Sequence, residues 1–190
     1  MSQAAENLVF SAEDYLAWEE LQEEKHEYVN GEVFAMGGAR REHVHVAGNV
    51  FATLKQHLRG TSCRPYMSDM KLHIETIDTF FYPDIIVSCN KNDHQAEQFL
   101  LSPRLIIEVL SDSTEAYDRG NKFAAYRQIA SLNEYVLVNI KTRTVEYFRR
   151  TADNDWLLHV YANDDVCNFM SLDVSVKMSV IFEDIVDNQQ

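Results

Sequence analysis

Apolar residues recur at helical spacing in two stretches of the first sixty residues. The first helix is predicted from about residue 11 to 24, because Ser11 and Asp14 form a capping-box pattern ahead of an apolar face. The second is predicted from about Arg40 to Arg59, with Gly60 as the residue that ends it. A third helix is predicted at about 114–130.

The remaining apolar runs are short and read as strands. Asn30-Gly31 lies between two such runs and predicts a type I′ hairpin over 27–34. Further strands are predicted near 66–75, 81–88, 104–110, 134–140, 144–149 and 156–161, with a strand or short helix in the tail from 174 to 186. Because the strands neither alternate strictly with helices nor come only as hairpins, we expect a single α/β domain over 1–190 with a mixed central β-sheet flanked by helices.

Composition limits the cellular compartments in which the protein is expected. No apolar run approaches the ~20 residues of a membrane span, and the N-terminus lacks the basic and apolar regions of a signal peptide. Cys63, Cys89 and Cys167 are odd in number and lie far apart in no zinc spacing, so free thiols in a reducing compartment are expected. These features predict a cytoplasmic protein that does not enter membranes.

The charge is strongly uneven. The net charge is −13, with −8 in residues 1–32, +2 in 33–150 and −7 in 151–190. A negative total opposes nucleic-acid binding, which depends on phosphate contacts. The middle of the chain does not share that excess, although it carries no strong basic patch.

Two acids in that middle region stand in apolar surroundings. Asp84 follows Tyr82-Pro83 at the start of a buried run, and Glu108 interrupts Leu105-Ile-Ile and Val109-Leu. An ionised acid in such a position needs compensation. A strand cap at Asp84 and a salt bridge at Glu108 are the structural alternatives, whereas a divalent cation would compensate both acids. Hard oxygen ligands favour Mg²⁺ or Mn²⁺ over zinc.

Lys122 follows on the third predicted helix. Its simplest reading is an exposed i, i+4 pair with Asp118, and the functional alternative is a lysine facing the two acids. Gly120 between them is a poor helix residue and indicates close approach to another backbone. Tyr126 shares the face of Lys122, and we expect it to pack in the aromatic core or against the site.

These residues carry a resemblance to a known family. The chain resembles the Uma-type family of restriction endonuclease-like proteins, within the PD-(D/E)XK nuclease superfamily. The resemblance covers about residues 15–186 and rests on blocks that occur in the family's order: Asn30-Gly31-Glu32, Gly37-Gly38 with His43, Tyr82-Pro83-Asp84, Glu108-Val-Leu-Ser111, Ser113-Thr114-Glu115, Asp118-Arg119-Gly120-Asn121-Lys122 and Glu134-Tyr-Val-Leu137. It implies a restriction endonuclease-like fold.

The resemblance also implies a role for each matching residue. Asp84 and Glu108 would bind the metal with the main-chain carbonyl of Val109. The family departs from the superfamily at the next position, where Leu110 stands in place of the motif lysine, and Lys122 would supply that ammonium from the following helix. Two further residues are implied to belong to the site: Glu32, as an additional acid, and His43, near the scissile phosphate.

The leading hypothesis is therefore a metal-dependent endonuclease that hydrolyses DNA, using Mg²⁺ or Mn²⁺. Many nucleases of this superfamily act as homodimers, which makes a homodimer the expected assembly. The alternative is a catalytically inactive nuclease-fold dimer that serves as an interaction or nucleic-acid-binding module. Leu110 and the acidic composition favour this alternative. Sequence specificity and a preference for DNA over RNA are open.

Overall fold

The computed structural model describes residues 10–186 and is built around a six-stranded sheet. Its strand order is β11-β10-β9-β8-β6-β3, with β8 and β9 parallel and the other pairs antiparallel. The strands are β3 (Arg64–Met67), β6 (Ile85–Ser88), β8 (Pro103–Val109), β9 (Glu134–Asn139), β10 (Thr144–Arg150) and β11 (Trp156–Ala162). The expected mixed central sheet is confirmed.

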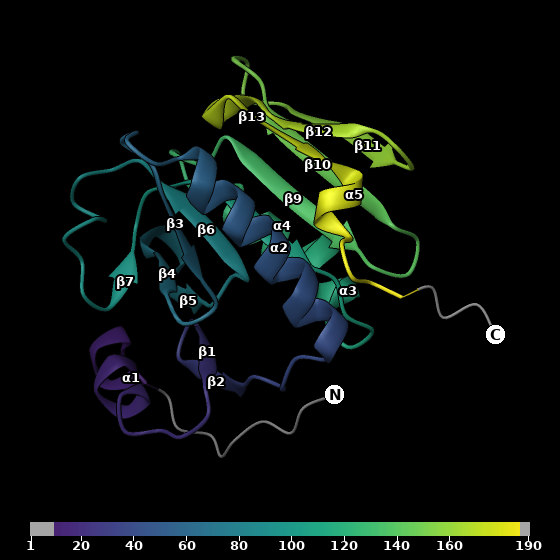
Figure 1. Ribbon diagram of the computed structural model, residues 1–190. Helices are drawn as coiled ribbons and strands as arrows, with labels where there is room; N and C mark the ends of the chain where they lie inside the picture. The colour runs from purple at the N-terminus through teal and green to yellow at the C-terminus, as the bar shows by residue number, and fades with distance from the viewer. Residues whose placement is uncertain (1–9, 187–190) are drawn as a thin grey trace.

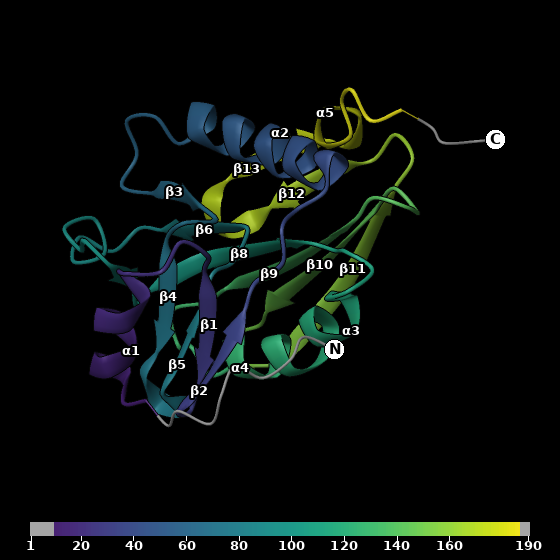
Figure 2. The same ribbon diagram turned by 90° about the horizontal axis from the view of Figure 1, so that it is seen from below.

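A second sheet of five strands packs against one face of the first (Figure 2). It runs in the order β2-β1-β5-β4-β7, from β1 (His26–Val29), β2 (Glu32–Ala35), β4 (Lys71–Ile74), β5 (Thr79–Phe81) and β7 (Phe99–Leu100). The predicted hairpin is β1–β2. Its turn residues Asn30 and Gly31 both have positive φ, 47° and 98°, as a type I′ turn requires.

Helices cover the outer surfaces of these sheets (Figures 1 and 2). They are α1 (Ala12–Glu19), α2 (Arg41–His57), α3 (Glu115–Tyr117), a π-helical turn (Asp118–Lys122), α4 (Phe123–Tyr126) and α5 (Met178–Ile181), with 3₁₀ turns at Glu75–Ile77 and Met170–Leu172. The small sheet β12 (Val166–Phe169)–β13 (Val174–Lys177) joins α2 and α5 on one face of the central sheet. No helix within residues 10–186 is long and apolar enough to cross a membrane.

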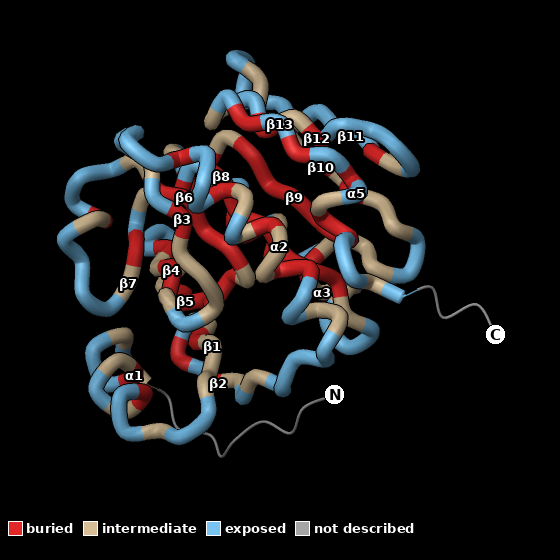
Figure 3. Tube along the Cα trace, viewed as in Figure 1, coloured by how far each residue is buried: buried red, intermediate tan, exposed pale blue. Residues whose placement is uncertain are grey.

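Alternation along β8 assigns its side chains to the two faces. Ile107 and Val109 pack in the core beneath α2, while Ile106 and Leu110 pack in the core beneath α4 and the five-stranded sheet. Strands β6, β8 and β9 are almost wholly buried (Figure 3). The side chain of Glu108 therefore lies on the face covered by α4, where it is buried.

Several predicted elements are divided in the structure. The run at 66–75 forms parts of β3 and β4, which belong to different sheets, and the run at 81–88 forms the end of β5 and all of β6. The helix predicted at 114–130 is interrupted by the π turn and ends at Tyr126. The first helix keeps its Ser11–Asp14 capping box but ends at Glu19 rather than near residue 24. Strands β7 and β12 were not predicted.

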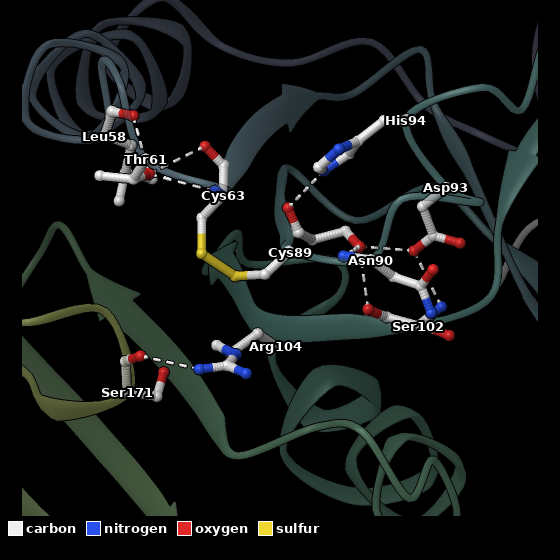
Figure 4. Close-up of a disulfide and its surroundings, with 11 residues drawn as sticks. Leu58, Thr61, Cys63, Cys89, Asn90, Asp93, His94, Ser102, Arg104 and Ser171 are labelled. Carbon is white, nitrogen blue, oxygen red and sulfur yellow. Dashed lines mark hydrogen bonds between the residues drawn. A yellow bond between two sulfur atoms is a disulfide. The ribbon is translucent and has the colours of Figure 1, made fainter.

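The expectation of three free thiols is wrong. Cys63 and Cys89 form a disulfide (Figure 4). Within the described chain only Cys167 is a free cysteine. The antiparallel register of β3 and β6 pairs Arg64 with Ser88, so the residue before β3 faces the residue after β6. Sequence spacing could not reveal this, because the pairing depends on β3 and β6 being neighbours. The cytoplasmic prediction loses the support it drew from free thiols.

Candidate active site

The predicted acids meet at one edge of the central sheet. Strand β6 begins there and β8 ends there, because the two run antiparallel with Ile85 opposite Ile107. Asp84 precedes β6 and Glu108 is the penultimate residue of β8. The sheet register alone therefore brings together two acids that are separated by 24 residues.

Each of these acids accepts a backbone hydrogen bond from the other's strand. The Asp84 N–H donates to Glu108 Oε2 at 3.2 Å, and the Val109 N–H donates to Asp84 Oδ2 at 2.7 Å. Asp84 is one-fifth exposed and Glu108 is buried, so Asp84 forms the accessible side of the pair. These bonds hold the two carboxyl groups in defined orientations.

Lys122 reaches Glu108 from the π-helical turn. It faces the acids, which is the second of the two positions expected for it. Its Nζ donates to Glu108 Oε1 at 3.1 Å, and it lies 2.9 Å from Glu27 Oε1 and 3.7 Å from Asp118 Oδ1. The ammonium is buried, so the reading of an exposed i, i+4 pair is wrong even though the Asp118 contact exists. Three carboxyl groups raise the pKa of Lys122 against the lowering effect of burial.

The π turn sets the position of Lys122. Asp118 and Lys122 bound this turn, and both are buried. A buried tyrosine, Tyr135, donates its hydroxyl to the Asp118 carbonyl at 3.0 Å, which satisfies a backbone acceptor in the irregular helix. Gly120 does not mark a close approach, because a Cβ built on it would meet nothing within 4 Å. π turns recur at functional sites.

The hairpin contributes an acid, but it is Glu27 and not the predicted Glu32. Glu32 is exposed and lies opposite Val29 in the β1–β2 register. Because Val29 is two residues after Glu27 on β1, Glu27 and Glu32 lie on the same face of the hairpin. The hydrogen bonds and ion pairs of the Lys122 cluster include Glu27 and do not include Glu32. Both glutamates belong to the hairpin, so its sequence does not tell them apart. Only the folded structure shows that Glu27 is the one that reaches Lys122.

His43 and Tyr126 complete the set from two different helices. His43, in the first turn of α2, places Nε2 at 2.9 Å from Asp84 Oδ1, while its neighbour His45 is exposed. Burial lowers the pKa of His43, but the hydrogen bond and charge of Asp84 outweigh it and raise the pKa overall. Tyr126 donates its hydroxyl to Glu108 Oε1 at 2.8 Å. Its position against the site, one of the two expected for it, is thus observed.

Carboxyl groups outnumber cations in this cluster. Glu27, Asp84, Glu108 and Asp118 surround one ammonium and one imidazole. Burial, opposed by Lys122, raises the pKa of Glu108 to about 8, and Asp118 and Asp84 add to the rise. The cluster therefore gains from an additional positive charge, which would oppose the rise in the pKa of Glu108.

The chemistry of the donor set fits a hard divalent cation. Mg²⁺ is commonly bound through one or two carboxylates together with water and substrate phosphate, and Asp84 and Glu108 supply two. Glu27 Oε1 is buried 2.9 Å from Lys122 Nζ, so this third carboxyl group is paired with the ammonium. Within residues 10–186 no three His, Cys, Asp or Glu side chains are arranged to hold a metal by themselves, since the acids converge on Lys122.

Comparisons with known proteins bear on the family and the fold. A family model described as "Putative restriction endonuclease" (Uma2) matches residues 12–179. Two uncharacterised proteins of Synechocystis sp. are similar: slr1290 is 38% identical over 90% of this chain and 90% of its own length, and sll1609 is 32% identical over 83% of this chain and 90% of its own length. A crystal structure of a protein from Anabaena variabilis, described as a "putative nuclease" of DUF820, superposes with a TM-score of 0.73 at 17% identity, covering 91% of this chain and 97% of that one. This likeness establishes the restriction endonuclease-like fold.

Proposed function

Because the chain belongs to the Uma2 family, we propose that it is a metal-dependent endonuclease that hydrolyses DNA phosphodiester bonds. The observation that carries the proposal is the buried contact of Lys122 with Glu108, 3.1 Å from Nζ to Oε1, beside Asp84. The superfamily motif has a lysine at the position of Leu110, which here is buried in the core. Lys122 would supply the missing ammonium group.

Asp84, Glu108 and the main-chain carbonyl of Val109 would hold Mg²⁺ or Mn²⁺. When bound, such an ion acts as a Lewis acid on the phosphoryl oxygens and lowers the pKa of water. Its charge would also favour the ionised form of Glu108, which is disfavoured without it. Binding of the ion and loss of the Glu108 proton are therefore expected to be coupled.

The remaining residues position groups and carry charge. Lys122 would orient the attacking water or stabilise the negative charge that develops on the phosphate. Tyr126 and the Asp84 N–H fix the two oxygens of Glu108, and Val109 N–H fixes Asp84. His43 donates its Nε2–H to Asp84 Oδ1 at the exposed side of the pair, where a phosphate would enter. A homodimer remains the assembly we propose for cutting both strands.

The test is plasmid nicking with Mg²⁺ and with Mn²⁺. Asp84→Asn and Glu108→Gln are each expected to abolish nicking, because both remove ligand charge. Asp69→Asn is the matched control, since Asp69 is an exposed acid paired with Lys25 outside the cluster. Nicking that persists unchanged in Asp84→Asn would refute the proposed site.

A second candidate is a catalytically inactive nuclease fold that binds nucleic acid or another protein. All four carboxyl oxygens of Asp84 and Glu108 already have hydrogen-bond partners in the protein, which favours this candidate because a metal would have to compete with them. Calorimetric titration with Mn²⁺ distinguishes the two. Absence of binding by the wild type, together with absence of nicking, would favour this candidate.

A further inference from the structure

Exposed charges gather at the same sheet edge as the buried acids. They are Arg40, Asp112 and Lys141, which we call the rim cluster. Arg40 is the N-cap residue of α2, Asp112 lies on the loop after β8, and Lys141 lies in the turn between β9 and β10. Three segments far apart in the sequence thus supply one small group of charges.

The strand directions place this cluster beside the site. Strands β8 and β9 are parallel, with Val109 opposite Val138, so the loops that follow them leave the sheet at the same edge. On the other side, α2 enters the site one turn after Arg40, where His43 contacts Asp84 at 2.9 Å. The rim cluster therefore borders the exposed side of the Asp84–Glu108 pair.

The contacts within the cluster resemble those of a bound anion. Asp112 offers one carboxyl oxygen to each cation: Oδ2 lies 4.0 Å from Arg40 and Oδ1 pairs with Lys141. All three side chains are largely exposed, at 89% for Arg40, 71% for Lys141 and 52% for Asp112. Such exposed pairs contribute little to stability, so they are free to exchange for a stronger partner.

A DNA substrate needs cations at this position. The buried cluster has more carboxyl groups than cations, and it would repel the phosphates on either side of the scissile one. Arginine and lysine are the usual phosphate contacts, supported by hydroxyl groups. On the same loop as Asp112, the hydroxyl of Ser111 contacts those of Ser113 and Thr114. The loop thus offers neutral donors next to the two cations.

We propose that Arg40 and Lys141 bind a DNA backbone phosphate next to the scissile one, and that Asp112 occupies that phosphate's place when DNA is absent. This inference rests on the proposed function, because it assumes that DNA approaches the Asp84 side of the site. Asp112 then acts as a competitor whose removal strengthens binding, while removal of either cation weakens it.

The experiment is fluorescence anisotropy of a labelled duplex in Mg²⁺ across a series of salt concentrations, with duplex integrity checked on a gel. Arg40→Ala and Lys141→Ala should each weaken binding several-fold and reduce the salt slope by about one. Asp112→Asn should strengthen binding several-fold. Lys55→Ala is the matched control, because Lys55 is an exposed cation near the other end of α2 and should leave affinity unchanged.

The opposite signs separate this inference from a general charge effect. If Asp112→Asn fails to strengthen binding, or if both cation variants behave like Lys55→Ala, the inference is refuted. Nicking by the same preparations tests the proposed function separately. Asp84-dependent nicking with unaltered rim variants would refute the inference alone, whereas the expected binding pattern without any nicking would refute the nuclease and leave the phosphate site standing. A wild type that binds no duplex at low salt refutes the inference.

Discussion

The Nζ of Lys122 lies 3.1 Å from Oε1 of Glu108, although Lys122 enters from a helix and Glu108 from the central strand. The same ammonium also contacts Glu27 and Asp118, so one cation serves carboxyl groups from three elements. Removing it should expose how strongly the site depends on positive charge.

We predict that Lys122→Met destabilises the metal-free protein by about 3 kcal/mol, since breaking a buried ion pair leaves uncompensated charge. Mg²⁺ or Mn²⁺ should recover part of that loss, because the cation replaces some of the missing charge. Urea denaturation with and without metal measures both effects. Lys55→Met serves as the exposed control, and equal destabilisation of the two variants would contradict the prediction.

Glu27 and Glu32 allow a comparison within one hairpin. Glu27→Gln should weaken Mn²⁺ binding about tenfold, as loss of a supporting group around a metal does, because Glu27 orients Lys122. Glu32→Gln should leave binding unchanged, since Glu32 is exposed and outside the cluster contacts. Calorimetric titration decides between them. Weakened binding in Glu32→Gln alone would restore the role that the family resemblance implied for Glu32.

The raised pKa of Glu108 predicts how stability depends on pH. Between its unfolded pKa of 4.5 and its folded pKa of about 8, the folded state binds more protons than the unfolded state. Stability of the metal-free protein should therefore fall as pH rises through that window, by on the order of 2–4 kcal/mol. The raised pKa of His43 acts in the same direction, because stability from its charged form is lost as pH rises through the folded pKa.

Chemical denaturation in EDTA at several pH values measures this slope. Glu108→Gln should flatten it, whatever its effect on stability at one pH. A saturating metal concentration should also reduce the slope in the wild type, because the metal favours ionised Glu108. Stability that rises between pH 5 and pH 8 would show that the Glu108 proton is not retained on folding.

The disulfide makes a prediction that labelling can test directly. Cys63 and Cys89 enclose a long segment, and their joint replacement by serine should cost about 3 kcal/mol of stability. Alkylation of denatured, unreduced protein should label Cys167 alone, and prior reduction should allow all three cysteines to react. Labelling of three cysteines without reduction would contradict the bond.

Local patterns determined most of the secondary structure. The capping box at Ser11, the Asn30-Gly31 turn and the spacing along α2 are each contained within a few residues, and the structure keeps all three. Asp84 and Glu108 were recognisable because charged residues in apolar surroundings require partners. Lys122 follows them on the next predicted helix, and the family resemblance implied its role. Family resemblance added His43, whose ring contacts Asp84.

Tertiary structure decided which distant residues meet. Glu27 rather than Glu32 reaches Lys122 because the hairpin's register and its position over the sheet edge select one acid of two on the same face. Cys63 pairs with Cys89 because β3 and β6 are neighbours, and the π turn directs Lys122 inward. Spacing along the chain carries no information about such contacts, since they depend on strand order and on how separate elements pack.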